Sequence, residues 1–219
     1  TRHFKLSPRS STGRGKERNC PHTMKLLYVD CCITVHETSR TKLLADTFLS
    51  AWQKAHAGDE IEYLDAKALD LRPLMGEELV QREELLGSRR TGEPSFALAR
   101  QFAQADRIVI AAPFWELSFP AQLRLYIEHI SALNITFGYA QDGAPLGLCR
   151  AEKMLYLTTA GGVIEGKNCG ADHLRALCGM FGIRQFLFLG APMQDVKEID
   201  HQSILNDTLA QAREIALTF

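Results

Sequence analysis

The chain has 219 residues, of which 46% are hydrophobic, and a formal net charge of −1. This length and composition suit one globular domain with a full core. The near-neutral charge gives no reason to expect a nucleic acid as a partner. No apolar run is long enough to span a membrane, so we expect no membrane association.

Residues 1–23 differ in composition from the rest of the chain. They hold six basic residues and one acid, so the net charge splits into +5 for this segment and −6 for the remainder. The segment has no central hydrophobic stretch, which excludes a secretory signal. We expect a disordered N-terminal extension, a cloning remnant or upstream read-through, followed by one domain over residues 24–219. A transit peptide is the alternative, because the segment is rich in Arg and Ser.

The six cysteines form no C-x-x-C pair and lie near no histidine at zinc-finger spacing. The adjacent Cys31 and Cys32 are poorly placed to bridge each other, because the linkage would be strained. We therefore expect reduced thiols, no metal site and a cytoplasmic location.

Apolar strands and amphipathic helices alternate from the start of the predicted domain. Residues 25–31 and 60–66 are predicted strands. Between them, apolar residues at helical spacing predict a helix over 38–57, and Gly58 is a suitable stop.

A long excursion over residues 67–93 follows, with a helix predicted around 77–86. Pro94 can open another helix, carried by residues 95–105. The unbroken apolar run over 107–113 is typical of a central parallel strand.

The alternation continues to the C-terminus. Pro120 lies in the predicted first turn of a helix, and residues 134–150 are expected to form a hairpin or flap. Strands are predicted over 153–162 and 184–192, each followed by a helix, and Gly182 ends the helix between them.

Strands separated by helices imply a parallel sheet covered by helices on both faces. We therefore predict an α/β fold. It is a flavodoxin-like three-layer αβα sandwich with a five-stranded parallel sheet in the order 2-1-3-4-5. In such a sheet, ligands bind at the carboxyl ends of the strands, which here means the loops over 31–40, 113–119 and 159–168.

The first of these loops is rich in hydroxyl side chains but lacks a G-x-G-x-x-G motif. Thr34, Thr38, Ser39 and Thr41 lie before and within the start of a helix, where free amides favour an anion such as a phosphate monoester. Ordinary N-capping by Thr38 or Ser39 is the alternative, and the two roles are compatible.

The other two loops suit a flat ligand. In "AAPFWELSFPAQ", the rings of Phe114 and Trp115 can form a wall for a tricyclic ring. Alternatively, one ring faces the core and the other covers a subunit interface. In "TTAGGVIEG", Thr159 can donate a hydrogen bond, while Gly161 and Gly162 allow close backbone approach or simply form a turn. Together, the three loops predict a phosphate-bearing flat cofactor.

The motifs "PFWELSFPAQLRLYIEHI", "ITFGY" and "LTTAGG" resemble the FMN-dependent NADH azoreductases, which are also NAD(P)H:quinone oxidoreductases. The resemblance runs from Met24 to the C-terminus. It implies a homodimer with one FMN per subunit, each site completed by the partner chain, and places Phe137 and Tyr139 in a flap near the entrance. The residues expected to bind FMN are Cys31, Thr38, Ser39, Pro113, Phe114, Trp115, Glu116, Leu117, Thr159, Ala160, Gly161 and Gly162.

Three departures from the family pattern stand out. Cys31 and Cys32 replace serines, Glu116 replaces Asn, and Ala160 replaces a polar or basic residue. An acid beside the flavin would disfavour its anionic reduced form unless Glu116 turns away.

The resemblance implies an FMN-dependent NAD(P)H oxidoreductase that reduces quinones or azo compounds by ping-pong two-electron hydride transfer. No side chain is required as acid or base, although His36 or Tyr139 could assist a proton transfer. Two alternatives are a flavodoxin-type electron carrier and a catalytically inactive flavin-binding regulatory dimer.

Two further expectations come from the residues alone. Five aromatic residues exceed what one sheet edge needs, which favours a dimer: Trp115, Phe119, Tyr126, Phe137 and Tyr139. The candidates for binding the 2′-phosphate of NADPH are Arg150, Lys167 and Arg184.

Overall fold

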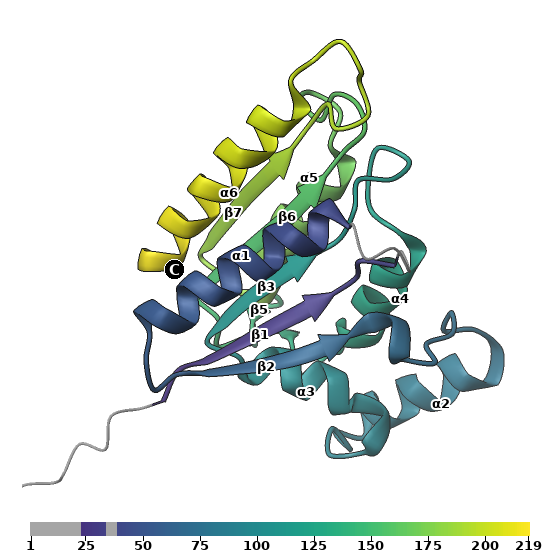
Figure 1. Ribbon diagram of the computed structural model, residues 1–219. Helices are drawn as coiled ribbons and strands as arrows, with labels where there is room; N and C mark the ends of the chain where they lie inside the picture. Colours follow the sequence, from purple (N-terminus) through teal and green to yellow (C-terminus); the bar gives the residue numbers. More distant parts are fainter. Residues whose placement is uncertain (1–22, 34–38) are drawn as a thin grey trace, which may run out of the picture.

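The computed structural model describes residues 23–33 and 39–219. A parallel sheet of five strands in the order β2-β1-β3-β6-β7 forms the centre of the fold (Figure 1). The predicted order is correct apart from numbering, because two short hairpin strands intervene in the sequence. The strands are β1 (Lys25–Asp30), β2 (Glu60–Asp65), β3 (Arg107–Ala111), β4 (Phe137–Tyr139), β5 (Pro145–Gly147), β6 (Lys153–Thr159) and β7 (Gln185–Ala191).

Helices cover both faces of the sheet. The α-helices are α1 (Arg40–Ala55), α2 (Gly76–Gly87), α3 (Ala97–Gln104), α4 (Ala121–Ile130), α5 (Cys169–Phe181) and α6 (His201–Thr218), and the 3-10 helices are η1 (Ala66–Ala68) and η2 (Pro94–Phe96). Helices α1 and α6 run side by side on one face, while α3, α4 and α5 pack on the other. The central strands are almost wholly buried, as their continuous apolar runs require.

Local sequence signals set some of the helix ends. Gly182 has φ of 81° at the C-terminus of α5, where a left-handed residue is needed. Two predicted ends are wrong by a few residues. Pro120 is the N-cap of α4 instead of lying in its first turn, and α1 ends at Ala55, three residues before Gly58.

Residues 67–93, the long predicted excursion between β2 and η2, pack beside the main sheet. Leu86 of α2 contacts a cluster with Phe96 and Ile135. The buried Arg82 donates to the carbonyl oxygen of His129 at 2.8 Å and lies over the Phe96 ring. A buried guanidinium therefore joins α2 to the end of α4.

The predicted hairpin over 134–150 is confirmed as the antiparallel pair β4–β5. Its base fits tightly against the end of α5, where Gly147 lies beside Phe181 and Gly182. The described cysteines are free thiols, as expected. Among the described residues, no helix is both long enough and apolar enough to cross a membrane.

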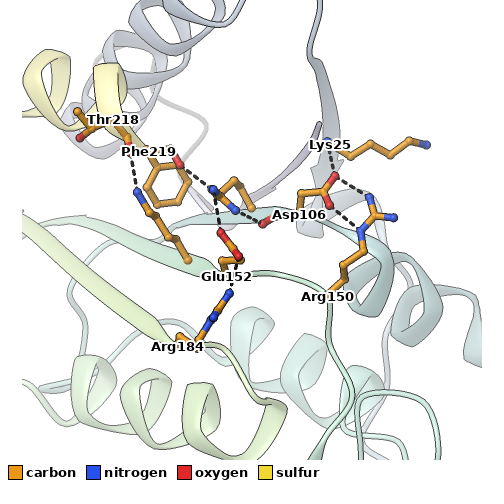
Figure 2. Close-up of polar contacts among 9 residues, drawn as sticks. Lys25, Asp106, Arg150, Glu152, Arg184, Thr218 and Phe219 are labelled. Carbon is orange, nitrogen blue, oxygen red and sulfur yellow. Dashed lines mark hydrogen bonds and ion pairs between the residues drawn. The ribbon is translucent and has the colours of Figure 1, made fainter. Parts of the chain in front are cut away.

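The amino ends of the strands carry a network of ion pairs (Figure 2). Arg150 pairs with Asp106 at 2.6 Å, and the Lys25 amide donates to the same carboxylate at 2.8 Å. Glu152 pairs with Arg184. These charges precede β3, β6 and β7, so they lie at the opposite sheet edge from the carboxyl ends.

The contact at the base of the hairpin yields a stability prediction. A Cβ atom at Gly147 would lie 2.1 Å from the Gly182 amide nitrogen. We expect Gly147→Ala to lower the free energy of unfolding by about 2 kcal/mol or more, because backbone must shift to accept it. The measurement is urea unfolding. The control is Gly179→Ala in the exposed interior of α5, where nothing lies within 4 Å. The control should be neutral or stabilising, and equal effects of the two substitutions would contradict the prediction.

Candidate active site

A cleft of about 290 Å³ opens at the carboxyl ends of the parallel strands. It brings together the three predicted loops. Eight of its lining residues were predicted: Ser39, Thr41, Pro113, Phe114, Trp115, Thr159, Ala160 and Gly161. Three were not: Arg40, Gln194 and Asp195. A larger groove of about 620 Å³ lies between α1 and α6, but it is lined by the outer residues of those helices, away from the strand ends.

Backbone hydrogen bonds continue the sheet beyond the strands and hold these loops together. The Phe114 amide donates to the Thr159 carbonyl oxygen at 3.1 Å, and the Ala160 amide donates to that of Ala191 at 2.9 Å. The loop over 113–119 (the aromatic loop), the loop over 159–168 (the glycine loop) and the loop after β7 are therefore fixed side by side.

The first turn of α1 forms one end of the cleft. Ser39 caps the helix, its hydroxyl accepting from the Lys42 amide at 3.3 Å. The amides of Arg40 and Thr41 lie in the first turn, where a helix provides no acceptor for them. The Thr41 hydroxyl lies 2.6 Å from that of Thr159 and ties α1 to the end of β6. Capping and anion binding are thus compatible at this helix end.

The aromatic loop turns sharply after Trp115. The amide of Trp115 donates to the Ser118 carbonyl oxygen at 3.1 Å, and the reverse bond is 2.6 Å. Glu116 and Leu117 have φ of 50° and 60°, a turn that usually takes Asn and Gly. The Trp115 amide is consequently used within the turn. The Trp115 ring remains 47% exposed.

Several predicted site residues do not line the cleft. Glu116, Leu117 and Gly162 lie beside it in the same loops, and Glu116 is exposed. Tyr139 is exposed on the hairpin. The predicted Thr34, His36 and Thr38 lie outside the described residues.

The expected phosphate contact of Cys31 is not supported by its position. Cys31 is fully buried in the core formed with α3, α4 and α5. Burial raises the pKa of its thiol, with the nearby Asp30 adding to the effect, so the thiol stays neutral and enclosed.

A fourth loop, which follows β7, was not predicted from the sequence. Its amides at Met193, Gln194 and Asp195 donate to the carbonyl oxygens of Gly162, Ala160 and Gly161, at 2.9 to 3.1 Å. Asp195 also pairs with Arg40 at 2.7 Å. The signal in the sequence that could have indicated this loop was its position after a parallel strand, which places it at the carboxyl edge of the sheet.

Two other expectations are wrong. Arg150 and Arg184 lie in the ion-pair network at the amino edge of the sheet, so they cannot serve a ligand in the cleft (Figure 2). Phe119 and Tyr126 are buried in the core and provide no surface for a partner, whereas Trp115 and Tyr139 are exposed.

An open parallel sheet with a cleft at its carboxyl ends defines a flavodoxin-like α/β protein. The family described as flavodoxin-like fold matches residues 24–216, so the chain belongs to that family. Two relatives extend the likeness over nearly the whole chain. The FMN-dependent NADH:quinone oxidoreductase 2 of Clostridium acetobutylicum is 34% identical over 200 residues, covering 89% of this chain and 99% of that protein. The FMN-dependent NADH:quinone oxidoreductase of Clostridium beijerinckii is 33% identical, with the same coverage.

Solved structures share the fold. An azoreductase from Bacillus anthracis str. Sterne has a TM-score of 0.79 at 23% identity, covering 90% of this chain and 100% of that one. An FMN-dependent NADH-azoreductase from Bacillus anthracis str. Ames Ancestor, in complex with FMN, has a TM-score of 0.74 at 20% identity, covering 88% and 97%. At these identities the likeness establishes the fold alone.

The turn after Trp115 yields a stability prediction. Glu116→Asn should raise the free energy of unfolding by about 0.5–1 kcal/mol, because Asn tolerates the left-handed conformation better than Glu. Urea unfolding measures the change. The matched control is Glu198→Asn, an exposed position outside the left-handed region. A gain no larger than in the control would contradict strain at Glu116.

Proposed function

We propose that this protein is an FMN-dependent NADH oxidoreductase that reduces quinones, azo compounds or both. It belongs with relatives named for that activity, which makes it an oxidoreductase enzyme. The observation that carries the proposal is that a helix N-terminus, an exposed tryptophan and a glycine loop line the same cleft.

The chemistry of the lining residues fits FMN. The first turn of α1, with the Ser39 and Thr41 hydroxyls, would receive the phosphate. Phe114 and Trp115 would pack against the isoalloxazine ring. The backbone around Gly161 would lie along the ring edge. Pro113, Thr159 and Ala160 complete these walls.

FMN, when bound, supplies the hydride chemistry between donor and acceptor. The protein's part is to hold the ring, exclude water and leave one face open. If NADH and the acceptor use the same open face in turn, the kinetics are ping-pong. The described residues that line the cleft include no histidine, tyrosine or lysine. We therefore expect protons to come from solvent, since Tyr139 of the hairpin does not line the cleft.

We further propose NADH over NADPH as the donor. A 2′-phosphate needs a basic pocket. Of the three candidates, only Lys167 belongs to a loop at the carboxyl edge of the sheet, and the acid Glu116 lies at the same edge, where Arg40 is already paired with Asp195.

The kinetic prediction is a kcat/KM for NADH about tenfold or more above that for NADPH, because the single lysine Lys167 does not make the basic pocket that a 2′-phosphate needs. Steady-state assays with menadione as acceptor measure the ratio. Lys167→Ala should leave the ratio nearly unchanged. A preference for NADPH that disappears in this variant would contradict the assignment.

A homodimer agrees with the exposed apolar residues near the cleft and hairpin. These residues are Trp115, Leu117, Tyr139, Leu146, Leu148 and Val163. Covering them with a second copy would also enclose the open side of the cleft.

The electron-carrier alternative is less well supported. Such carriers usually present a strongly acidic face to their partners, whereas residues 24–219 carry a net charge of −6 with both signs present. The deciding experiment is a visible spectrum of the FMN-reconstituted protein, followed by anaerobic addition of NADH and then menadione. We expect bleaching by NADH and recovery with menadione. A protein that binds FMN but is not bleached by NADH would be a carrier or an inactive dimer, and a protein that binds no FMN would end the proposal.

Trp115→Ala tests the aromatic wall. We expect FMN affinity to fall about tenfold and dimerisation to weaken, because the exposed ring would serve both. Fluorescence titration and sedimentation velocity measure the two effects. Leu217→Ala, an exposed apolar position on α6, is the control. Unchanged sedimentation together with unchanged flavin content would refute the role of Trp115.

A further inference from the structure

We propose that Asp195 is a positioning residue that holds the Arg40 guanidinium at the cleft as a receptor for the cofactor phosphate. The inference rests on the proposed function, because it assumes a phosphorylated ligand in this cleft. It concerns the fourth loop and the first residue of α1, neither of which the sequence reading assigned a role.

Asp195 is held firmly against the wall of the cleft. Its amide donates to the Gly161 carbonyl oxygen at 3.1 Å. Its carboxylate also lies on Gly161, because a Cβ atom there would be only 2.4 Å from Oδ2. A side chain at position 161 would therefore displace the carboxylate. Gly161 thus leaves room for Asp195 as well as for a ligand.

Arg40 reaches this carboxylate from the first turn of α1. Its Nη1 lies 2.7 Å from Asp195 Oδ1. The Arg40 side chain makes no other hydrogen bond or ion pair within the described part of the chain. A guanidinium has five N–H donors in a planar fork, so most of them stay available for phosphate oxygens. The same residue contributes a first-turn amide of α1, which places charge and amide at one helix end.

The pair does little for the fold itself. The side chains of Arg40 and Asp195 are 40% and 71% exposed, and exposed ion pairs contribute little to stability. The ion pair instead restrains the orientation of the Arg40 side chain. A long arginine side chain loses rotamer freedom when it binds a ligand, and a partner that already restrains it reduces that loss.

The test compares FMN with riboflavin, which has the same ring and polyol chain but no phosphate. Titration by flavin fluorescence would use the wild-type protein, Asp195→Ala and Asp195→Asn. Asp195→Ala should weaken FMN binding about three- to tenfold, because Arg40 must then be ordered by the ligand. Asp195→Asn keeps an oxygen that accepts from Arg40, so its FMN affinity should stay within about twofold of the wild type. Riboflavin affinity should be unchanged in both variants.

An Arg40→Met background shows whether Asp195 acts through Arg40. We expect Arg40→Met to weaken FMN binding but not riboflavin binding, and Asp195→Ala to add nothing to it. Circular dichroism melts control for folding.

Three outcomes would overturn the inference. They are tighter FMN binding in both Asp195 variants, equal losses for FMN and riboflavin, and an effect of Asp195→Ala that persists without Arg40. A fourth is FMN binding by Asp195→Ala as tight as that of the wild type, in which case the proposed function stands and only this inference fails. If the wild-type protein binds neither flavin, the proposed function itself fails.

Discussion

The candidate site depends on backbone hydrogen bonds that extend the sheet past the ends of its strands. The Phe114 amide reaches the Thr159 carbonyl oxygen, and the Ala160 amide reaches that of Ala191. Because these bonds join loops that follow different strands, an aromatic wall, a glycine loop and a polar loop keep fixed relative positions. The Thr41–Thr159 hydroxyl contact then attaches the helix N-terminus to the same frame. A rigid frame of this kind holds a cofactor better than isolated loops would.

The two edges of the sheet differ in the polar groups that they carry. The amino edge carries the ion pairs of Asp106 and Glu152, which involve only the protein's own groups (Figure 2). The carboxyl edge carries the cleft and the left-handed turn at Glu116 and Leu117. Strained backbone at a ligand cleft is a common association, since the surrounding structure must hold it.

Much of the fold could be predicted from the sequence, because continuous apolar runs mark buried parallel strands and Gly182 marks a helix end. The site was harder to predict. Cys31 follows a strand directly, and only packing shows that its side chain enters the core. Asp195 pairs with a residue 155 positions away, which no local pattern reveals. Arg150 and Arg184 precede strands, and that position alone would have assigned them to the amino edge.

The most direct test of the account is a crystal structure of the protein grown with FMN. We expect the isoalloxazine ring against Phe114 and Trp115, and the phosphate at the first turn of α1 beside Arg40. Electron density for FMN in the larger groove between α1 and α6, or none in the cleft at saturating FMN, would contradict the account.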